Sequence, residues 1–116
     1  MSIEDVKQLS DTELNIKLCL SLDEECKTHK GYPDRVIRGG NFVKFPTRYC
    51  YDIAKAREAQ AKAIELDAER YVNNLYNACY GFERPDDHSI DELNVTHLLQ
   101  ATPRQISGAA YLTLKG

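Results

Sequence analysis

The stretch from residue 53 to residue 79 constrains the fold most strongly. Its pattern predicts a helix that is longer than a small domain is wide. Residues 53–66 are rich in alanine and other strong helix formers, and the apolar residues that follow recur at helical spacings. This apolar series is Ile64, Ala68, Tyr71, Val72, Leu75 and Cys79. A single helix over 53–79 would be about 40 Å long, which exceeds the width of a domain of this size. We therefore expect a bend or break near Leu66–Asp67, with Gly81 ending the second part.

Two further helices have clear signals at their first residues. Ser10 followed by Glu13 forms a capping box, which predicts a helix at about 11–21. Thr102 and Gln105 form a second capping box, with a proline at the first helical position. The last helix is expected to turn one apolar face inward through Ile106, Ala109, Ala110 and Leu114.

The β structure is predicted from a glycine turn and from alternation. Gly39-Gly40 separates two apolar runs, which predicts an antiparallel hairpin at about 35–45 with a two-residue turn. Alternating apolar residues predict a further strand at about 93–99. These residues are Leu93, Val95, His97 and Leu99. The expected fold is a single α+β domain over 1–116, with three to four helices packed on a small antiparallel sheet.

Composition excludes several classes of protein. No run of about 18 uncharged apolar residues is present, so we expect no transmembrane helix, and the charged N-terminal segment does not resemble a signal peptide. We therefore expect a cytoplasmic protein. The four cysteines form no CxxC pair, so we expect free thiols and no metal site. No nucleophile, phosphate-loop or dinucleotide motif is found, so we expect neither an enzyme nor a bound cofactor.

Charge is distributed unevenly along the chain. Residues 27–48 carry a net charge of +5 while the whole chain carries −3, so the remainder carries −8. The basic residues are Lys27, Lys30, Arg35, Arg38, Lys44 and Arg48. They could contact phosphates, or they could only keep an exposed hairpin edge soluble. A polar loop contributes acids that could imitate phosphates, namely Asp86, Asp87, Asp91 and Glu92.

The chain contains seven tyrosines and no tryptophan. Tyrosine combines a large apolar ring with a polar tip, which suits protein interfaces, although such residues also border the cores of many α+β domains. Tyr49 and Tyr51 are expected to share one face of an extended segment, and Tyr76 lies on the second helical stretch. Arginines and aromatics interleaved across 32–51 could also stack single-stranded bases.

The order of two motifs resembles a known family. Residues 45–52 (Phe-Pro-Thr-Arg-Tyr-Cys-Tyr-Asp) lead into a helix, and residues 101–105 (Ala-Thr-Pro-Arg-Gln) open the last one. Over about residues 11–115 this pattern resembles the small bacteriophage accessory proteins of the phage ABA sandwich domain family. The resemblance implies a phage or prophage origin and an α+β fold, and it implies no activity.

These observations favour a non-enzymatic, phage-encoded binding protein in the host cytoplasm. It would be a stoichiometric inhibitor or modulator of a host or anti-phage defence protein, for example a CRISPR effector. The expected protein-binding residues are Asp86, Asp87, Asp91, Glu92, Tyr49, Tyr51 and Tyr76. The alternatives are a nucleic-acid-binding module, or a nucleotide-sequestering protein, that uses the basic residues of 27–48. A homodimer packed through the alanine-rich face of 54–63 is a further expectation.

Overall fold

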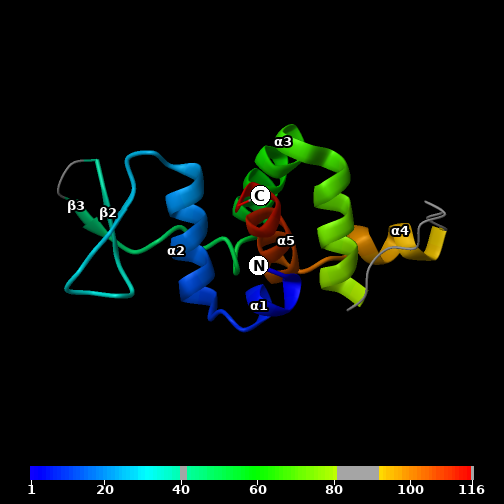
Figure 1. The fold of residues 1–116 in the computed structure, drawn as a ribbon, viewed down its shortest axis with the longest axis horizontal. Helices are drawn as coiled ribbons and strands as arrows, with labels where there is room; N and C mark the ends of the chain where they lie inside the picture. The colour runs from blue at the N-terminus through cyan, green and yellow to red at the C-terminus, as the bar shows by residue number, and fades with distance from the viewer. Residues whose placement is uncertain (40–41, 81–91, 116) are drawn as a thin grey trace.

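The computed structural model describes residues 1–39, 42–80 and 92–115 (Figure 1). Its elements in chain order are α1 (Ile3–Lys7), α2 (Asp11–Leu22), β1 (Lys27–Thr28), β2 (Val36–Arg38), β3 (Phe42–Lys44), α3 (Ile53–Tyr80), α4 (Glu92–Leu99) and α5 (Pro103–Lys115). The strands form one antiparallel sheet in the order β1-β2-β3. The α+β class is therefore confirmed. No helix in the described ranges has the length and apolar character needed to cross a membrane.

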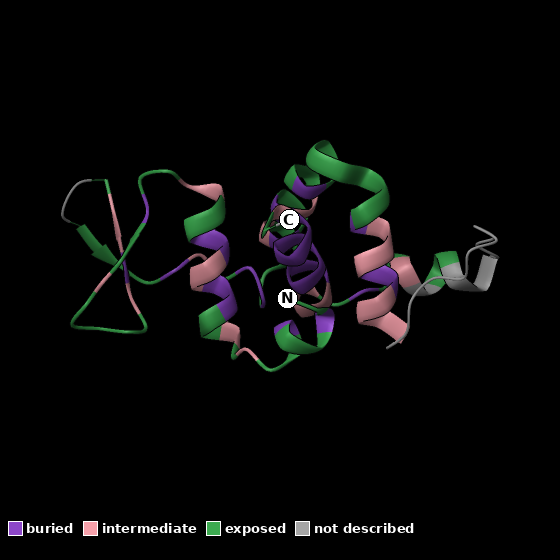
Figure 2. Ribbon diagram, viewed as in Figure 1, coloured by how far each residue is buried: buried purple, intermediate pink, exposed green. Residues whose placement is uncertain are grey.

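Helix α5 lies at the centre of the molecule, between α2 and α3, while the sheet lies at one end beyond α2 (Figure 1). The molecule is elongated, with extents of 49 × 25 × 23 Å. Residues 106–113 of α5 are buried without interruption, which is unusual for a surface helix and follows from contacts with α1, α2 and α3 (Figure 2). The core is thus built around α5, and the sheet is left as a projecting end.

Helix α3 breaks at Asp67, as its length predicts. The backbone of Asp67 is extended, with φ −162° and ψ 92°. Its Oδ1 accepts a hydrogen bond from the Arg70 amide at 3.1 Å, so Asp67 acts as the N-cap of the second arm. The break lets both arms of α3 contact α5 (Figure 1). The predicted stop at Gly81 lies outside the described residues.

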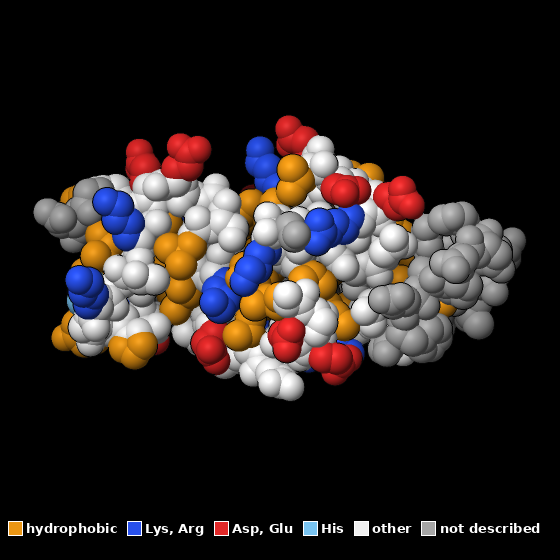
Figure 3. Space-filling view, in the orientation of Figure 1, with side chains coloured by type: hydrophobic (Ala, Val, Ile, Leu, Met, Phe, Trp, Pro, Cys, Tyr) orange, Lys and Arg blue, Asp and Glu red, His pale blue; other side chains and the backbone are white. Residues whose placement is uncertain are grey.

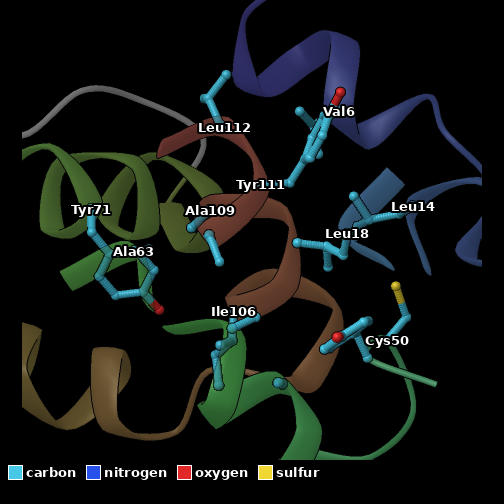
Figure 4. Packing of buried hydrophobic residues seen from close by; sticks show 14 of the residues in the cluster. Val6, Leu14, Leu18, Cys50, Ala63, Tyr71, Ile106, Ala109, Tyr111 and Leu112 are labelled. Atoms are coloured by element: carbon cyan, nitrogen blue, oxygen red, sulfur yellow. The ribbon is translucent and has the colours of Figure 1, made fainter. Parts of the chain in front are cut away.

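Small residues bring α3 and α5 close together. Ala56, Ala59 and Ala63 are fully buried on the first arm of α3, and Ala109 is fully buried on α5. Figure 4 shows Ala63 and Ala109 within this contact, which is the most extensive between any two elements. The buried alanines of 54–63 are consequently used inside the chain, whereas Ala54 and Ala61 are exposed. The homodimer expected through that face stays a prediction.

The capping boxes predicted from sequence are confirmed. The Glu13 amide donates to Ser10 Oγ at 3.1 Å, and the Gln105 amide donates to Thr102 Oγ1 at 3.1 Å. Each glutamate or glutamine side chain in turn accepts from the backbone N–H of its capping residue. Sequence reasoning missed α1, whose own capping box begins at Ser2.

Two expectations about β structure are corrected. Residues 92–99 form α4 rather than a strand, because Val95, Leu98 and Leu99 also lie at the i, i+3, i+4 spacing of a helix. The third strand is β1, which pairs with β2. In the hairpin, Arg38 pairs with Phe42, so three residues join the strands instead of two. Gly39 has φ +56°, a left-handed conformation that favours glycine.

The thiols are largely buried. Cys19, Cys26 and Cys50 belong to the hydrophobic core, and Cys79 is half-buried. Burial raises the pKa of the Cys26, Cys50 and Cys79 thiols, which favours their protonated forms. Cysteine in such positions commonly packs as a small apolar side chain.

Candidate functional site

The segment 45–52 links the sheet to the core, and buried side chains hold its backbone. The Cys50 amide donates to Asn15 Oδ1 of α2 at 2.9 Å. On the other side, Ser107 Oγ of α5 donates to the Tyr49 carbonyl at 2.8 Å. Each of these side chains is buried, so water cannot replace the bonds without local opening. The segment is therefore fixed between the two helices.

Arg38 of β2 fastens the sheet to α2. Its Nη2 donates to Thr47 Oγ1 at 2.9 Å and to Cys19 Sγ at 3.3 Å. Its Nε lies 3.3 Å from a carboxylate oxygen of Asp23, which follows α2 directly. The guanidinium is thus occupied by internal partners. Arg38 therefore has a structural role, and its assignment to a phosphate-binding surface stays a prediction.

Arg104 has a comparable structural role at the start of α5. Its Nη2 donates to the carbonyls of Val6 and Leu9, each at 2.8 Å. Its Nη1 lies 3.4 Å from the Asp11 carboxylate. One side chain therefore joins α5 to the end of α1 and the start of α2. The residues at 101–105 that carry the family resemblance hold the fold together.

The outer side of the fixed segment forms one wall of a cavity of about 400 Å³. The cavity lies between the first half of α2 and the sheet end, and its lining residues are Thr12, Asn15, Asp34, Phe45, Pro46, Arg48 and Tyr51. Two of these aromatics are paired with arginines. The Arg35 guanidinium carbon lies 3.6 Å from the centre of the Phe45 ring, and that of Arg48 lies 5.0 Å from the centre of the Tyr51 ring.

Some charged groups around this cavity have ion-pair partners and others do not. Asp34 forms an ion pair with Arg35, whereas Arg48 has no ion pair with any described residue. A hydrogen bond to Asp11 raises the pKa of the Tyr51 hydroxyl. Arg48 is therefore the cation of this wall that remains available to a ligand.

Asn15 gives the cavity a polar buried group. Only 3% of its surface is exposed, and its Oδ1 is occupied by the Cys50 amide. That bond fixes which end of the side-chain amide faces the segment. Nδ2 has no acceptor among the described residues, but it is not one of their buried polar atoms without a partner, so it keeps access to the cavity. Asn15 was missed in the sequence, where its only signal is an amide set between the buried leucines of α2.

Large apolar side chains are exposed at the sheet end of the molecule. We call this set the sheet-end surface, and its members are Tyr32, Phe42, Val43, Phe45 and Tyr51. Phe42 and Phe45 each keep 67% of their surface exposed. Exposed Lys27, Lys30, Lys44 and Arg48 lie on the same segments. Figure 3 shows hydrophobic and basic side chains together at this end.

The structure separates the tyrosines that were predicted to bind a partner. Tyr51 is exposed, but Tyr49 and Tyr76 are buried, so neither can contact a partner directly. Tyr49 and Tyr51 do not share a face because the segment is a turn, in which the Asp52 amide donates to the Arg48 carbonyl at 2.9 Å. Their assignment rested on extended backbone and is corrected here.

The acidic residues predicted as a site are not placed by the structure. Asp86, Asp87 and Asp91 lie outside the described residues, and Glu92 is the first residue of α4. Arg35 is half-buried beside Asp34, whereas the three lysines of the basic set are exposed. Of the predicted residues, the structure brings Tyr51 and the basic residues of 27–48 to one end of the molecule, namely Lys27, Lys30, Arg35, Arg38, Lys44 and Arg48.

Comparison of the chain with family models, curated proteins and solved structures returned no match. Within the described part of the chain, no group of three or more histidine, cysteine or acidic residues is arranged to hold a metal ion. Function is therefore argued from the geometry of the sheet end and its cavity.

Proposed function

We propose that this protein is a non-enzymatic binding protein that acts by stoichiometric contact with another protein through its sheet-end surface. The observation that carries the proposal is the concentration of exposed aromatic and aliphatic side chains on and beside β3. Scattered apolar residues are normal on a surface, whereas a cluster of this kind typically marks an interaction site. The resemblance to phage accessory proteins supports a host or anti-phage defence protein as the partner.

The sheet end is prepared for contact because side chains hold its described part to the core. Arg38 fastens it to α2, and Asn15 holds the adjoining turn. A rigid surface loses little conformational freedom on binding, so more of the contact energy contributes to affinity. Aromatic residues and arginine also dominate the energetically important positions of known interfaces.

The charge around this surface indicates what kind of partner fits it. Exposed lysines of β1 and β3, together with Arg48, surround the aromatic residues. Such charges at a rim mainly raise the association rate and exclude partners of the same sign. The partner surface is therefore expected to combine an apolar centre with acidic residues.

Capture of the partner tests this proposal. The protein is immobilised and a bound host protein is identified. The affinity of the two purified proteins is then measured by calorimetry. The variant Phe42→Ser/Val43→Ser removes the apolar part of β3 and should weaken the complex at least about tenfold. The matched control is Ile64→Ser/Leu66→Ser, which removes two similarly exposed residues of α3. Equal affinity for both variants would contradict the proposal.

Single-stranded nucleic acid is a second candidate, favoured by the two arginine–aromatic pairs at the same end. A labelled oligonucleotide and a salt titration distinguish it from a protein partner. Nucleic acid binding should fall steeply with salt and should be lost when Lys27, Lys30 and Lys44 are changed to glutamate. If the oligonucleotide does not bind at low salt, this candidate is excluded.

A further inference from the structure

We propose that the cavity between α2 and the sheet end binds a nucleoside monophosphate. This goes beyond protein contact, because it assigns a small ligand to a concave part of the molecule, which shares Phe45, Tyr51 and Arg48 with the proposed contact surface. The cavity volume of about 400 Å³ lies within the range of about 300–1,000 Å³ that is usual for small-molecule sites. Its lining combines apolar rings with a few polar groups, as such sites commonly do.

The walls of the cavity suit a flat aromatic ring. Phe45 and Tyr51 both line the cavity, and more than half of the surface of each residue is exposed. Each ring is accompanied by an arginine guanidinium, which also stacks on planar groups. Unpaired nucleobases are recognised by stacking on aromatic rings and guanidinium planes. The ring of the ligand is therefore assigned to this pair of walls.

Asn15 offers the ligand a donor that is held in place. Its Nδ2 reaches the cavity and has no acceptor among the described residues, and the Cys50 amide prevents the side chain from turning over. A ring nitrogen or carbonyl oxygen of a nucleobase would satisfy it. Asp34 also lines the cavity and offers an acceptor to a ring N–H or amino group. The two residues together match the donor and acceptor edge of a base.

Arg48 assigns an anionic group to the ligand. It lines the cavity, is exposed, and has no ion pair with the described residues. A guanidinium can donate two parallel hydrogen bonds to a phosphate. Thr12, whose side chain is exposed near the start of α2, lines the same cavity and can donate a further bond. The phosphate is therefore placed beside Arg48, toward solvent.

Calorimetric titration of the purified chain with the four common ribonucleoside monophosphates tests the proposal. At least one should bind with a dissociation constant below 1 mM, on the order of the weakest specific small-ligand sites. Arg48→Gln should weaken that nucleotide at least about tenfold and should weaken the matching nucleoside less. Arg57→Gln, on the exposed face of α3, should change neither. Tyr51→Leu should weaken the nucleotide and the nucleoside alike.

Three results would overturn the proposal. The first is that no nucleotide binds at 10 mM, a concentration on the order of ten times the expected limit. The second is that Arg48→Gln binds the nucleotide with the same affinity as the parent chain. The third is that ribose 5-phosphate or inorganic phosphate binds as tightly as the nucleotide. Melting curves establish beforehand that each variant is folded. The assay needs no partner protein, and Phe42 does not line the cavity. Failure of the ligand site and failure of the protein contact are thus measured separately.

Discussion

Arg104→Met tests whether one guanidinium joins three helices. Methionine keeps the apolar stem but removes every donor, so the Val6 and Leu9 carbonyls lose their 2.8 Å hydrogen bonds and Asp11 loses its ion pair. A hydrogen bond to a charged group contributes about 1.5–3 kcal/mol. The Arg104 side chain is 27% exposed, so water partly replaces these bonds. We expect the free energy of unfolding to fall by about 2–4 kcal/mol, less than the sum of the separate bonds.

Urea unfolding followed by circular dichroism measures this change. For a chain of this length about 1 kcal/mol corresponds to about 4 °C, so the melting temperature should fall by about 8–16 °C. Arg57→Met is the matched control, because the Arg57 side chain is exposed and bonds only to Gln60 among the described residues. A loss below about 1 kcal/mol for Arg104→Met, or an equal loss for the control, would refute the reasoning.

Three further changes test other parts of the fold. Thr102→Ala removes the N-cap of α5 and should lower the free energy of unfolding by about 1 kcal/mol, as judged by the denaturant midpoint; an unchanged midpoint argues against the cap. Gly39→Ala should cost about 1–2 kcal/mol because its φ is +56°, whereas Gly31→Ala, at a glycine without positive φ, should cost less. Burial raises the pKa of Tyr71 from 10.0 to about 12. Its neutral form is thus favoured in the folded state, and stability should be lost as pH rises from 10 to about 12. In Tyr71→Phe the free energy of unfolding, measured by urea titration, should fall less between pH 9 and about pH 11 than it does in the parent chain. The same fall in both proteins would contradict this prediction.

Features set by neighbours in sequence could be predicted, and features set by distant contacts could not. The capping boxes at Ser10 and Thr102 depend on residues three positions apart, and the break at Asp67 follows from helix length. The strand expected at 93–99 failed because Val95 and Leu99 fit both periods, and only Leu98 between them distinguishes a helix.

The site depended on contacts that no local pattern encodes. Asn15 and Cys50 are 35 positions apart, and their hydrogen bond fixes Asn15 Nδ2 as the donor that faces the cavity. Tyr49 and Tyr76 are buried by tertiary contacts that their spacing in the sequence does not encode. The basic and aromatic character of 27–51 was visible in the sequence, but its division into framework and exposed surface required the fold. Arg38 belongs to the first and Arg48 to the second.

Amide hydrogen exchange on the rebuilt complex tests the central claim, that the sheet end is the contact surface. The free protein and its 1:1 complex are compared peptide by peptide. Binding through the sheet-end surface predicts new protection in peptides covering 27–51, with little change in the first arm of α3, which lies outside the proposed contact. Protection confined to residues 81–91 would instead place the contact at the acidic loop. Protection confined to α3 or α5 would contradict the account altogether.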